Sequence, residues 1–126
     1  MHLHRCILRA YGLTFVSDEL YAGFRDRIKA GLKVDGVIGR NDGLACVAMA
    51  AVKDCGLRVP EDVAVLGIDN SRVSMYSVPG LSSVELNKPA IAQAIMDAFQ
   101  QMNNGAEPPV IYFDGHIVER ESTRIK

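Results

Sequence analysis

One stretch of the chain, residues 34–68, constrains the fold more than any other, because its pattern predicts a strand, a helix and a second strand with short connections. "VDGVIG" (34–39) predicts a short buried strand, and "GLACVAMAAVKDCG" (43–56) predicts an Ala-rich helix that ends at Gly56. "VAVLGI" (63–68) lacks polar alternation, as expected of a strand covered on both faces. When a helix connects two strands of one sheet, the strands are parallel and the crossover is right-handed. The predicted fold class is α/β with a parallel sheet.

Further helices and strands are predicted on both sides of this unit. Upstream, residues 2–11 predict the end of a helix, and a second helix follows the candidate N-cap Ser17. Downstream, 82–86 predicts a short strand, 88–103 a long helix, and 110–122 one or two strands. The Ser-rich stretch between the strand at 63–68 and the strand at 82–86 is expected to be irregular surface loop.

Composition limits the class of protein. The chain has 126 residues, enough for one domain with a core, and its net charge of −1 shows no basic footprint for direct nucleic-acid binding. No apolar run is long enough to span a membrane, and no secretory signal core is present at the start. Cys6, Cys46 and Cys55 lack metal-like spacing and are expected to be free thiols in a reducing compartment. The expected location is therefore the cytoplasm.

Polar residues follow both strands of the central unit. Asn41 and Asp42 come after the first strand, and Asp69 and Asn70 come after the second. Ligands bind open parallel sheets beyond the carboxyl ends of the strands, so these side chains suit a small polar ligand such as a sugar. An alternative stays open: Asn41 and Asp42 could cap the following helix, while Asp69 and Asn70 could simply form a turn. A mixture is also open, in which Asp42 caps and Asn41 faces the ligand.

Other chemistry finds little support in the sequence. His2 and His4 form an H-x-H pair at the terminus, and His116 has no evident partner, so no metal site is predicted. Nucleotide-binding and hydrolase motifs are missing, and loop composition accounts for the serines between 71 and 83. No acid–base pair can be assembled. We therefore expect no catalytic residues, no cofactor and no enzymatic activity.

The stretch "DGVIGRNDGLACVAMAAVKDCGLRVPEDVAVLGIDN" (35–70) resembles the effector-binding domain of the lac repressor/galactose repressor family of bacterial transcription factors. The shared features are an N-D pair before an Ala-rich helix, "GLRVPEDV" (56–63) and "GID" (67–69). "PGLSSVELNK" (79–88) is similar to the family's P-x-L-T-[ST]-[VI] segment, and "ERESTR" (119–124) to its R-x-S-[TS]. The resemblance implies a Rossmann-like lobe of a type I periplasmic-binding-protein-like domain.

The resemblance also implies a ligand site. It assigns effector contacts to Asn41 and Asp69, and a further contact to Lys88 at the crossover between lobes. In the family such residues hold the hydroxyls of a sugar or, in other members, the polar edge of a purine. The implied function is the small-molecule-sensing part of a transcriptional regulator that acts as a homodimer.

The same resemblance implies that the chain is a partial effector domain, 1–126. Residues of about 1–86 and 114–126 would form the C-terminal lobe, and about 87–113 would belong to an N-terminal lobe. We expect no helix-turn-helix in this chain, so that operator DNA would be bound only through a missing N-terminal domain. The apolar stripe of the helix at 88–103 would then have no lobe to join, and it is expected to fold onto the remaining lobe or to be buried in a dimer. Its members are Ile91, Ile95, Ala98, Phe99 and Met102.

Alternatives with the same or a related fold stay open at this point. A sugar-binding component of a transporter would need a secretory leader upstream. A xylose-type activator would need a DNA-binding domain downstream, and a doubly wound enzyme would need catalytic residues that the sequence does not show.

Overall fold

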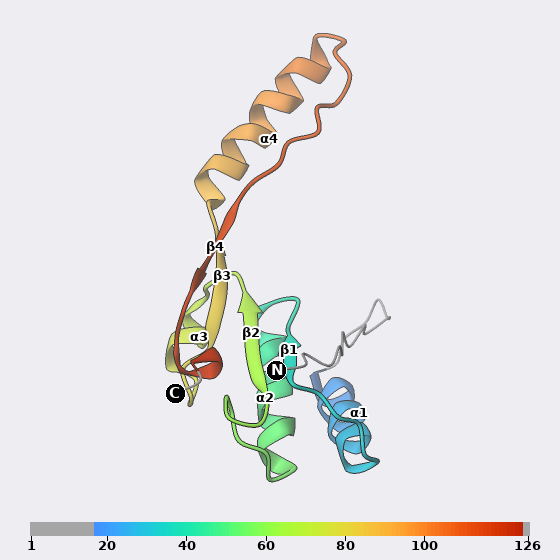
Figure 1. Ribbon diagram of the computed structural model, residues 1–126. Helices are drawn as coiled ribbons and strands as arrows, with labels where there is room; N and C mark the ends of the chain where they lie inside the picture. The colour runs from blue at the N-terminus through green and yellow to red at the C-terminus, as the bar shows by residue number, and fades with distance from the viewer. Residues whose placement is uncertain (1–16, 125–126) are drawn as a thin grey trace.

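The computed structural model describes residues 17–124, whose strands form one four-stranded sheet in the order β1-β2-β3-β4 (Figure 1). The strands are β1 (Gly36–Ile38), β2 (Ala64–Ile68), β3 (Ser82–Leu86) and β4 (Gly115–Val118). The first three are parallel, and β4 pairs antiparallel with β3. The mixed, mostly parallel open sheet confirms the predicted α/β class.

Four α-helices and one short 3-10 helix accompany the sheet. They are α1 (Ser17–Lys29), α2 (Asp42–Asp54), α3 (Arg72–Tyr76), α4 (Lys88–Asn103) and η1 (Glu121–Thr123). The predicted strand–helix–strand unit is confirmed, since α2 connects the parallel neighbours β1 and β2. The predicted helix over 2–11, together with His2, His4 and Cys6, lies outside the described residues.

Two expectations for the middle of the chain are wrong. The stretch expected to be irregular contains α3, and Ser74 within that helix is fully buried. Strand β2 was expected to be covered on both faces, but its burial alternates: Val65 and Gly67 are buried, while Ala64 and Leu66 are only half-buried. One face of β2 therefore carries most of the packing.

Helix α2 supplies the centre of the core. Its residues Ala45 and Met49 pack with Val65 of β2 and with Leu81, which precedes β3. A second cluster joins α2 to α1 through Phe24, Ala48, Ala51, Val52 and Val63. Because the Ala side chains of α2 are small, both the sheet and α1 can pack closely against this helix.

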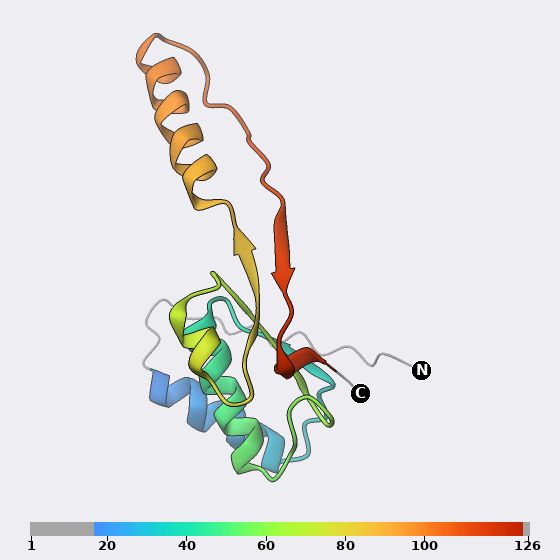
Figure 2. The same cartoon turned by 90° about the vertical axis from the view of Figure 1, so that its left-hand side faces the viewer.

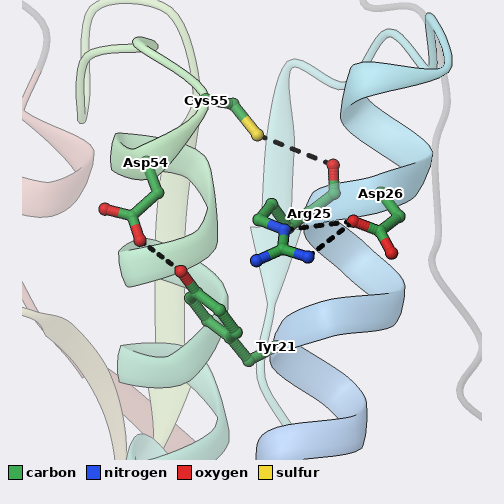
Figure 3. Close-up of polar contacts among 5 residues, drawn as sticks. All are labelled: Tyr21, Arg25, Asp26, Asp54 and Cys55. Carbon is green, nitrogen blue, oxygen red and sulfur yellow. Dashed lines mark hydrogen bonds and ion pairs between the residues drawn. The ribbon is translucent and has the colours of Figure 1, made fainter.

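Polar contacts fasten α1 to the end of α2 (Figure 3). The Tyr21 hydroxyl donates a hydrogen bond to the Asp54 carboxylate, which raises the pKa of Tyr21. The Arg25 guanidinium lies 5.5 Å from the centre of the Tyr21 ring and pairs with Asp26 at 2.9 Å. The Cys55 thiol donates to the Arg25 carbonyl oxygen at 3.6 Å. The bonds from Tyr21 to Asp54 and from Cys55 to Arg25 hold α1 against the end of α2, whereas the contacts of Arg25 with Tyr21 and Asp26 lie within α1.

The described cysteines are free thiols, as expected. Cys46 and Cys55 are both partly buried and form no disulfide. Burial raises the pKa of the Cys46 thiol. Burial therefore favours the neutral thiol of Cys46 over the thiolate.

Helix α4 with its N-cap Asn87 and the returning segment 104–114, together called the extension (87–114), stand away from the rest of the molecule (Figures 1 and 2). Strands β3 and β4 are its only covalent links to the remainder, which we call the lobe (17–86 and 115–124). No residue of α4 is buried, and Phe99 is 58% exposed. Of the two expectations for the apolar stripe, folding onto the lobe is therefore wrong, whereas burial in a dimer stays a prediction.

Candidate functional site

Three predicted ligand contacts follow three parallel strands at one edge of the sheet. Asn41 follows β1, Asp69 directly follows β2, and Lys88 lies two residues after β3. Because β1, β2 and β3 are parallel neighbours, their carboxyl ends share this edge. Such an edge is where open α/β sheets bind ligands.

Asn41 is the N-cap of α2. Its Oδ1 atom accepts a hydrogen bond from the Leu44 backbone N–H at 2.9 Å. The cap satisfies one of the N–H groups that a helix leaves unpaired at its start. The side chain keeps its amide N–H donors for another partner. Of the two capping candidates in the N-D pair, Asn41 is therefore the one that caps.

Asp42 has a different role from the cap that the sequence allowed. It is the first residue of α2 and is 1% exposed. Its carboxylate accepts hydrogen bonds from the segment after β2 and from β3. Oδ2 accepts from the Ser71 N–H at 2.6 Å and from the Ser71 hydroxyl at 2.8 Å, and Oδ1 accepts from the Ser83 hydroxyl at 2.5 Å. Gly67 gives this carboxylate its space, because a Cβ atom there would collide with Oδ1. Asp42 thus ties together the segments that follow β1 and β2.

Asp69 begins the turn after β2 with a left-handed backbone, φ 104°. Its N–H donates to the Val84 carbonyl oxygen at 2.9 Å, and its own carbonyl oxygen accepts from Lys88 Nζ at 2.9 Å. The structure thus brings Asp69 and Lys88 together. Within residues 17–124 the half-buried Asp69 carboxylate accepts no hydrogen bond. That carboxylate therefore has no hydrogen-bond donor among the described residues.

Asn70 continues the turn with φ 45° and is fixed on two sides. Its N–H donates to the Ser83 hydroxyl at 3.0 Å, and its Oδ1 accepts from Arg120 Nη2 at 2.7 Å. Residues 70–79 were expected to be surface loop, but this end of the segment is anchored to β3 and to the C-terminal segment. The turn Asp69–Ser71 is therefore held by contacts from distant parts of the chain.

Arg120 lies two residues after β4 and gathers several acceptors. Its Nη1 donates to the Leu81 carbonyl oxygen at 2.7 Å and to the Ser74 hydroxyl at 3.1 Å. Its backbone N–H donates to the Ser82 hydroxyl at 2.8 Å. Ser122 continues this network by donating to the Val65 carbonyl oxygen at 2.6 Å. Across the described part of the chain, every buried side-chain nitrogen or oxygen has a hydrogen-bond partner.

Sequence patterns did not identify Asp42, Ser83 and Arg120 as residues that organise the site. The serines had been assigned to loop composition, yet Ser74, Ser82 and Ser83 are fully buried and hydrogen-bonded. The available signal for Ser82, Ser83 and Arg120 was their position inside the two later motifs, "PGLSSVELNK" and "ERESTR". Fixed motif positions for small polar residues indicate specific hydrogen bonds rather than loop composition.

His116, for which the sequence showed no partner, has one. Its Nε2 atom lies 3.1 Å from a Glu85 carboxylate oxygen, because the two residues are paired across β3 and β4. Among residues 17–124 no group of three or more His, Cys, Asp or Glu side chains could hold a metal ion. In the same span, no helix is both long and apolar enough to cross a membrane.

Comparison with known proteins shows that the chain is similar to transcriptional regulators. Residues 6–123 match the family described as periplasmic binding protein-like domain. The chain is 33% identical over 96 residues to the transcriptional regulator AscG of Escherichia coli K12, covering 75% of this chain and 29% of AscG. It is 32% identical over 119 residues to the transcriptional regulator CelR of Thermobifida fusca, covering 91% of this chain and 34% of CelR.

Solved structures that resemble this chain are also those of transcriptional regulators. A LacI-family transcriptional regulator from Sanguibacter keddieii superposes with a TM-score of 0.75 at 28% identity, covering 88% of this chain and 43% of that one. The complex of CelR with cellobiose superposes with a TM-score of 0.71 at 28% identity, covering 86% of this chain and 34% of that one. The chain thus spans about a third of the length of the curated relatives that it matches.

Proposed function

Because the chain belongs to the periplasmic binding protein-like domain family and its relatives are LacI-family transcriptional regulators, we propose that it senses a small molecule, a sugar, for such a regulator. The chain covers only part of an effector domain. The proposed contacts are Asn41, Asp69 and Lys88 at the carboxyl edge of the sheet. The regulator as a whole would be cytoplasmic, since it acts on DNA.

The Asp69 carboxylate carries the proposal. It stands at the carboxyl end of a central strand, half-buried, in a turn held by hydrogen bonds on both sides. The protein's hydrogen bonds in this region fix the backbone and neighbouring side chains of the turn. Within residues 17–124 none of them is made to the Asp69 carboxylate. A rigidly placed acceptor without an internal partner suits a ligand that donates hydrogen bonds.

The chemistry of the three side chains favours a sugar. A carboxylate can accept bonds from two neighbouring hydroxyl groups, and such charge-assisted bonds are among the stronger ones. The Asn41 amide and the Lys88 ammonium add donors for the sugar's oxygen atoms. One neighbouring structure holds cellobiose, which has this chemistry. A purine, whose polar edge also suits an Asp and an Asn, is the ligand class that the test below separates from a sugar.

Sensing is favoured over the other activities of similar folds. AscG and CelR are transcriptional regulators, neither transporters nor enzymes. The site groups proposed here bind and orient a ligand, and no nucleophile–base pair is part of the proposal. We therefore assign no catalytic role to the site.

The extension (87–114) belongs, in this proposal, to a second lobe. Its apolar residues include Ile95, Phe99 and Tyr112, all largely exposed. Relatives about three times as long as this chain have room for that lobe and for a DNA-binding domain. A sugar between two lobes would shift the regulator, as a homodimer, between states that differ in DNA binding.

Calorimetric titration of the full-length regulator with sugars, cellobiose first, and with purines tests the proposal. We expect one sugar to bind, and we expect Asp69→Asn to lower the affinity for that sugar by about 100-fold, because a charge-assisted acceptor is lost. Asn41→Ala should weaken the same sugar by a smaller factor while α2 stays folded.

Asp35→Asn is the matched control, because Asp35 is an exposed carboxylate just before β1, at the opposite edge of the sheet. Its affinity for the sugar should equal that of the unmodified protein. Binding of a purine and of no sugar would refute the sugar assignment. Equal affinity in the Asp69 and Asp35 variants would refute the site.

A further inference from the structure

We propose that Arg120 is a positioning residue that holds the Asp69–Ser71 turn in place and joins this turn to the end of β4. The proposal deepens the function proposed above, because it concerns how the Asp69 contact is oriented and linked to the extension. Arg120 itself touches no proposed ligand. Its contribution is made through Asn70.

The turn needs external support. Asp69 and Asn70 both have positive φ values, 104° and 45°, a region that L-residues visit at a cost. Two such residues in succession persist only when surrounding contacts favour them over the common conformations. Arg120, which donates to the side-chain amide of Asn70, and the carboxylate of Asp42, which accepts from the Ser71 N–H, supply those contacts.

Arg120 reaches the turn from another part of the chain. It is 50 residues from Asn70 in sequence, yet Nη2 lies 2.7 Å from Asn70 Oδ1. The same guanidinium binds the Leu81 carbonyl oxygen just before β3 and the Ser74 hydroxyl in α3. A planar guanidinium can serve three acceptors in fixed directions at once, which the ammonium of a lysine cannot do with the same geometry.

The position of Arg120 in the chain gives this contact a consequence. Strand β4 ends at Val118, and β4 together with β3 connects the lobe to the extension (Figure 2). The Arg120 backbone N–H is fixed to Ser82 at the start of β3, while its side chain holds Asn70. A shift of β4 against β3 therefore changes the support of the turn. Whatever displaces the extension would be transmitted to the Asp69 contact.

Amide hydrogen exchange on the 126-residue chain tests the positioning role directly. The reporters are the N–H groups of Asp69, Asn70 and Ser71, which are bonded to Val84, Ser83 and Asp42. Arg120→Met should raise exchange at Asn70 and Ser71 by about tenfold or more, since charge-assisted bonds that support the turn are lost. Arg120→Lys should give an intermediate rise.

Two controls separate positioning from general destabilisation. Arg124→Met removes a guanidinium from the same segment that pairs with Glu119 at the surface, at 3.5 Å, and it should leave the turn amides unchanged. The amides of Gly39 and Ala64, bonded between β1 and β2, serve as reference reporters. If Arg120→Met raises exchange at the reference amides as much as at the turn, the positioning role is refuted.

The link to β4 has its own test, because coupling between two sites is reciprocal. Asn70→Gly keeps a residue that tolerates positive φ but removes the acceptor of Arg120. It should raise exchange at the Arg120 backbone N–H, because among the described residues the Arg120 side chain is what joins Asn70 to the segment after β4. Unchanged exchange at Arg120 would refute the coupling.

These measurements need no ligand, so they fail independently of the proposed function. A rise confined to the turn amides supports the positioning role even if the full-length regulator binds no sugar. No rise refutes it even if Asp69→Asn abolishes sugar binding.

Discussion

The lobe and the extension contain helices with the same kind of apolar periodicity and opposite fates. Helix α2 buries Ala45, Met49 and Val52 against the sheet and α1. Helix α4 carries an equally regular stripe, yet none of its residues is buried, and it stands clear of the lobe (Figure 1). The difference teaches that an amphipathic pattern predicts a helix and a face to be covered, whereas the covering element comes from elsewhere.

The polar groups of the two regions differ as well. In the lobe, Asp42 and Arg120 form hydrogen bonds with residues 29 to 50 positions away. In α4, Gln93 donates to Asp97 one helical turn later, an exposed local pair. Long-range bonds make the lobe one cooperative unit, while local pairs leave the extension dependent on its own helix.

Truncating the core should give the largest contrast. Leu81 is completely buried and Phe99 is 58% exposed. Leu81→Ala should lower the free energy of unfolding by about 2–5 kcal/mol, because it removes buried contacts and leaves a cavity. Phe99→Ala should change it by less than about 0.5 kcal/mol. Urea unfolding of dilute protein measures both, and similar losses would mean that α4 packs on the lobe after all.

Neutralising a carboxylate should sharpen the polar side of the comparison. Asp42→Asn should lower the free energy of unfolding by about 2 kcal/mol, because one of the three donors on this carboxylate meets an N–H group instead of an oxygen. Asp97→Asn is the matched change on α4 and should cost less than about 0.5 kcal/mol. Denaturant midpoints compare the two variants; a larger loss for Asp97 would overturn the contrast.

The smallest effect concerns acid stability of the lobe. Arg58 donates side-chain and backbone hydrogen bonds to Asp62 in the loop between α2 and β2, and they lower the pKa of Asp62 from 3.8 to about 2. A carboxyl whose pKa is lower in the folded state than in the unfolded chain stabilises the protein at any pH above its unfolded-state pKa. This contribution is lost as the pH falls from about 4 to about 2.

Asp62→Asn should therefore flatten the fall of stability between these pH values, as should Arg58→Met. Thermal unfolding at a series of pH values measures the slope. An unaltered slope in both variants would show that this pair contributes nothing to acid stability.

Much of the fold was predictable from local patterns. The strand–helix–strand unit and α4 were predicted close to their observed bounds because their periodicity or β-branched composition is strong. The bounds of β3 were also predicted, although Val84 is its only β-branched residue. Helix α3 was missed because five residues carry too little periodic signal, and its serines are typical of loops. Strand β4 is shorter than the predicted 110–122, since residues 110–114 pair with no described strand.

The candidate site was predictable only in outline. Asn41, Asp69 and Lys88 came from their places at strand ends and from a family resemblance, and their contact with a ligand stays a prediction. The exchange of roles between Asn41 and Asp42 could not be predicted, because Asp and Asn cap helices about equally well. The buried place of Asp42 depends on Gly67 and Ser83 of two other strands.

The sequence by itself determined the order of helices and strands, the family and the strand edge at which to look for a ligand. Those features depend on neighbouring residues or on motifs within short segments. Tertiary structure alone decided that Asp42 is buried, that Arg120 supports the turn at Asp69, and that the stripe of α4 faces outward. Each of these depends on what a distant part of the chain brings to the residue or, for α4, on no part of the described chain covering it.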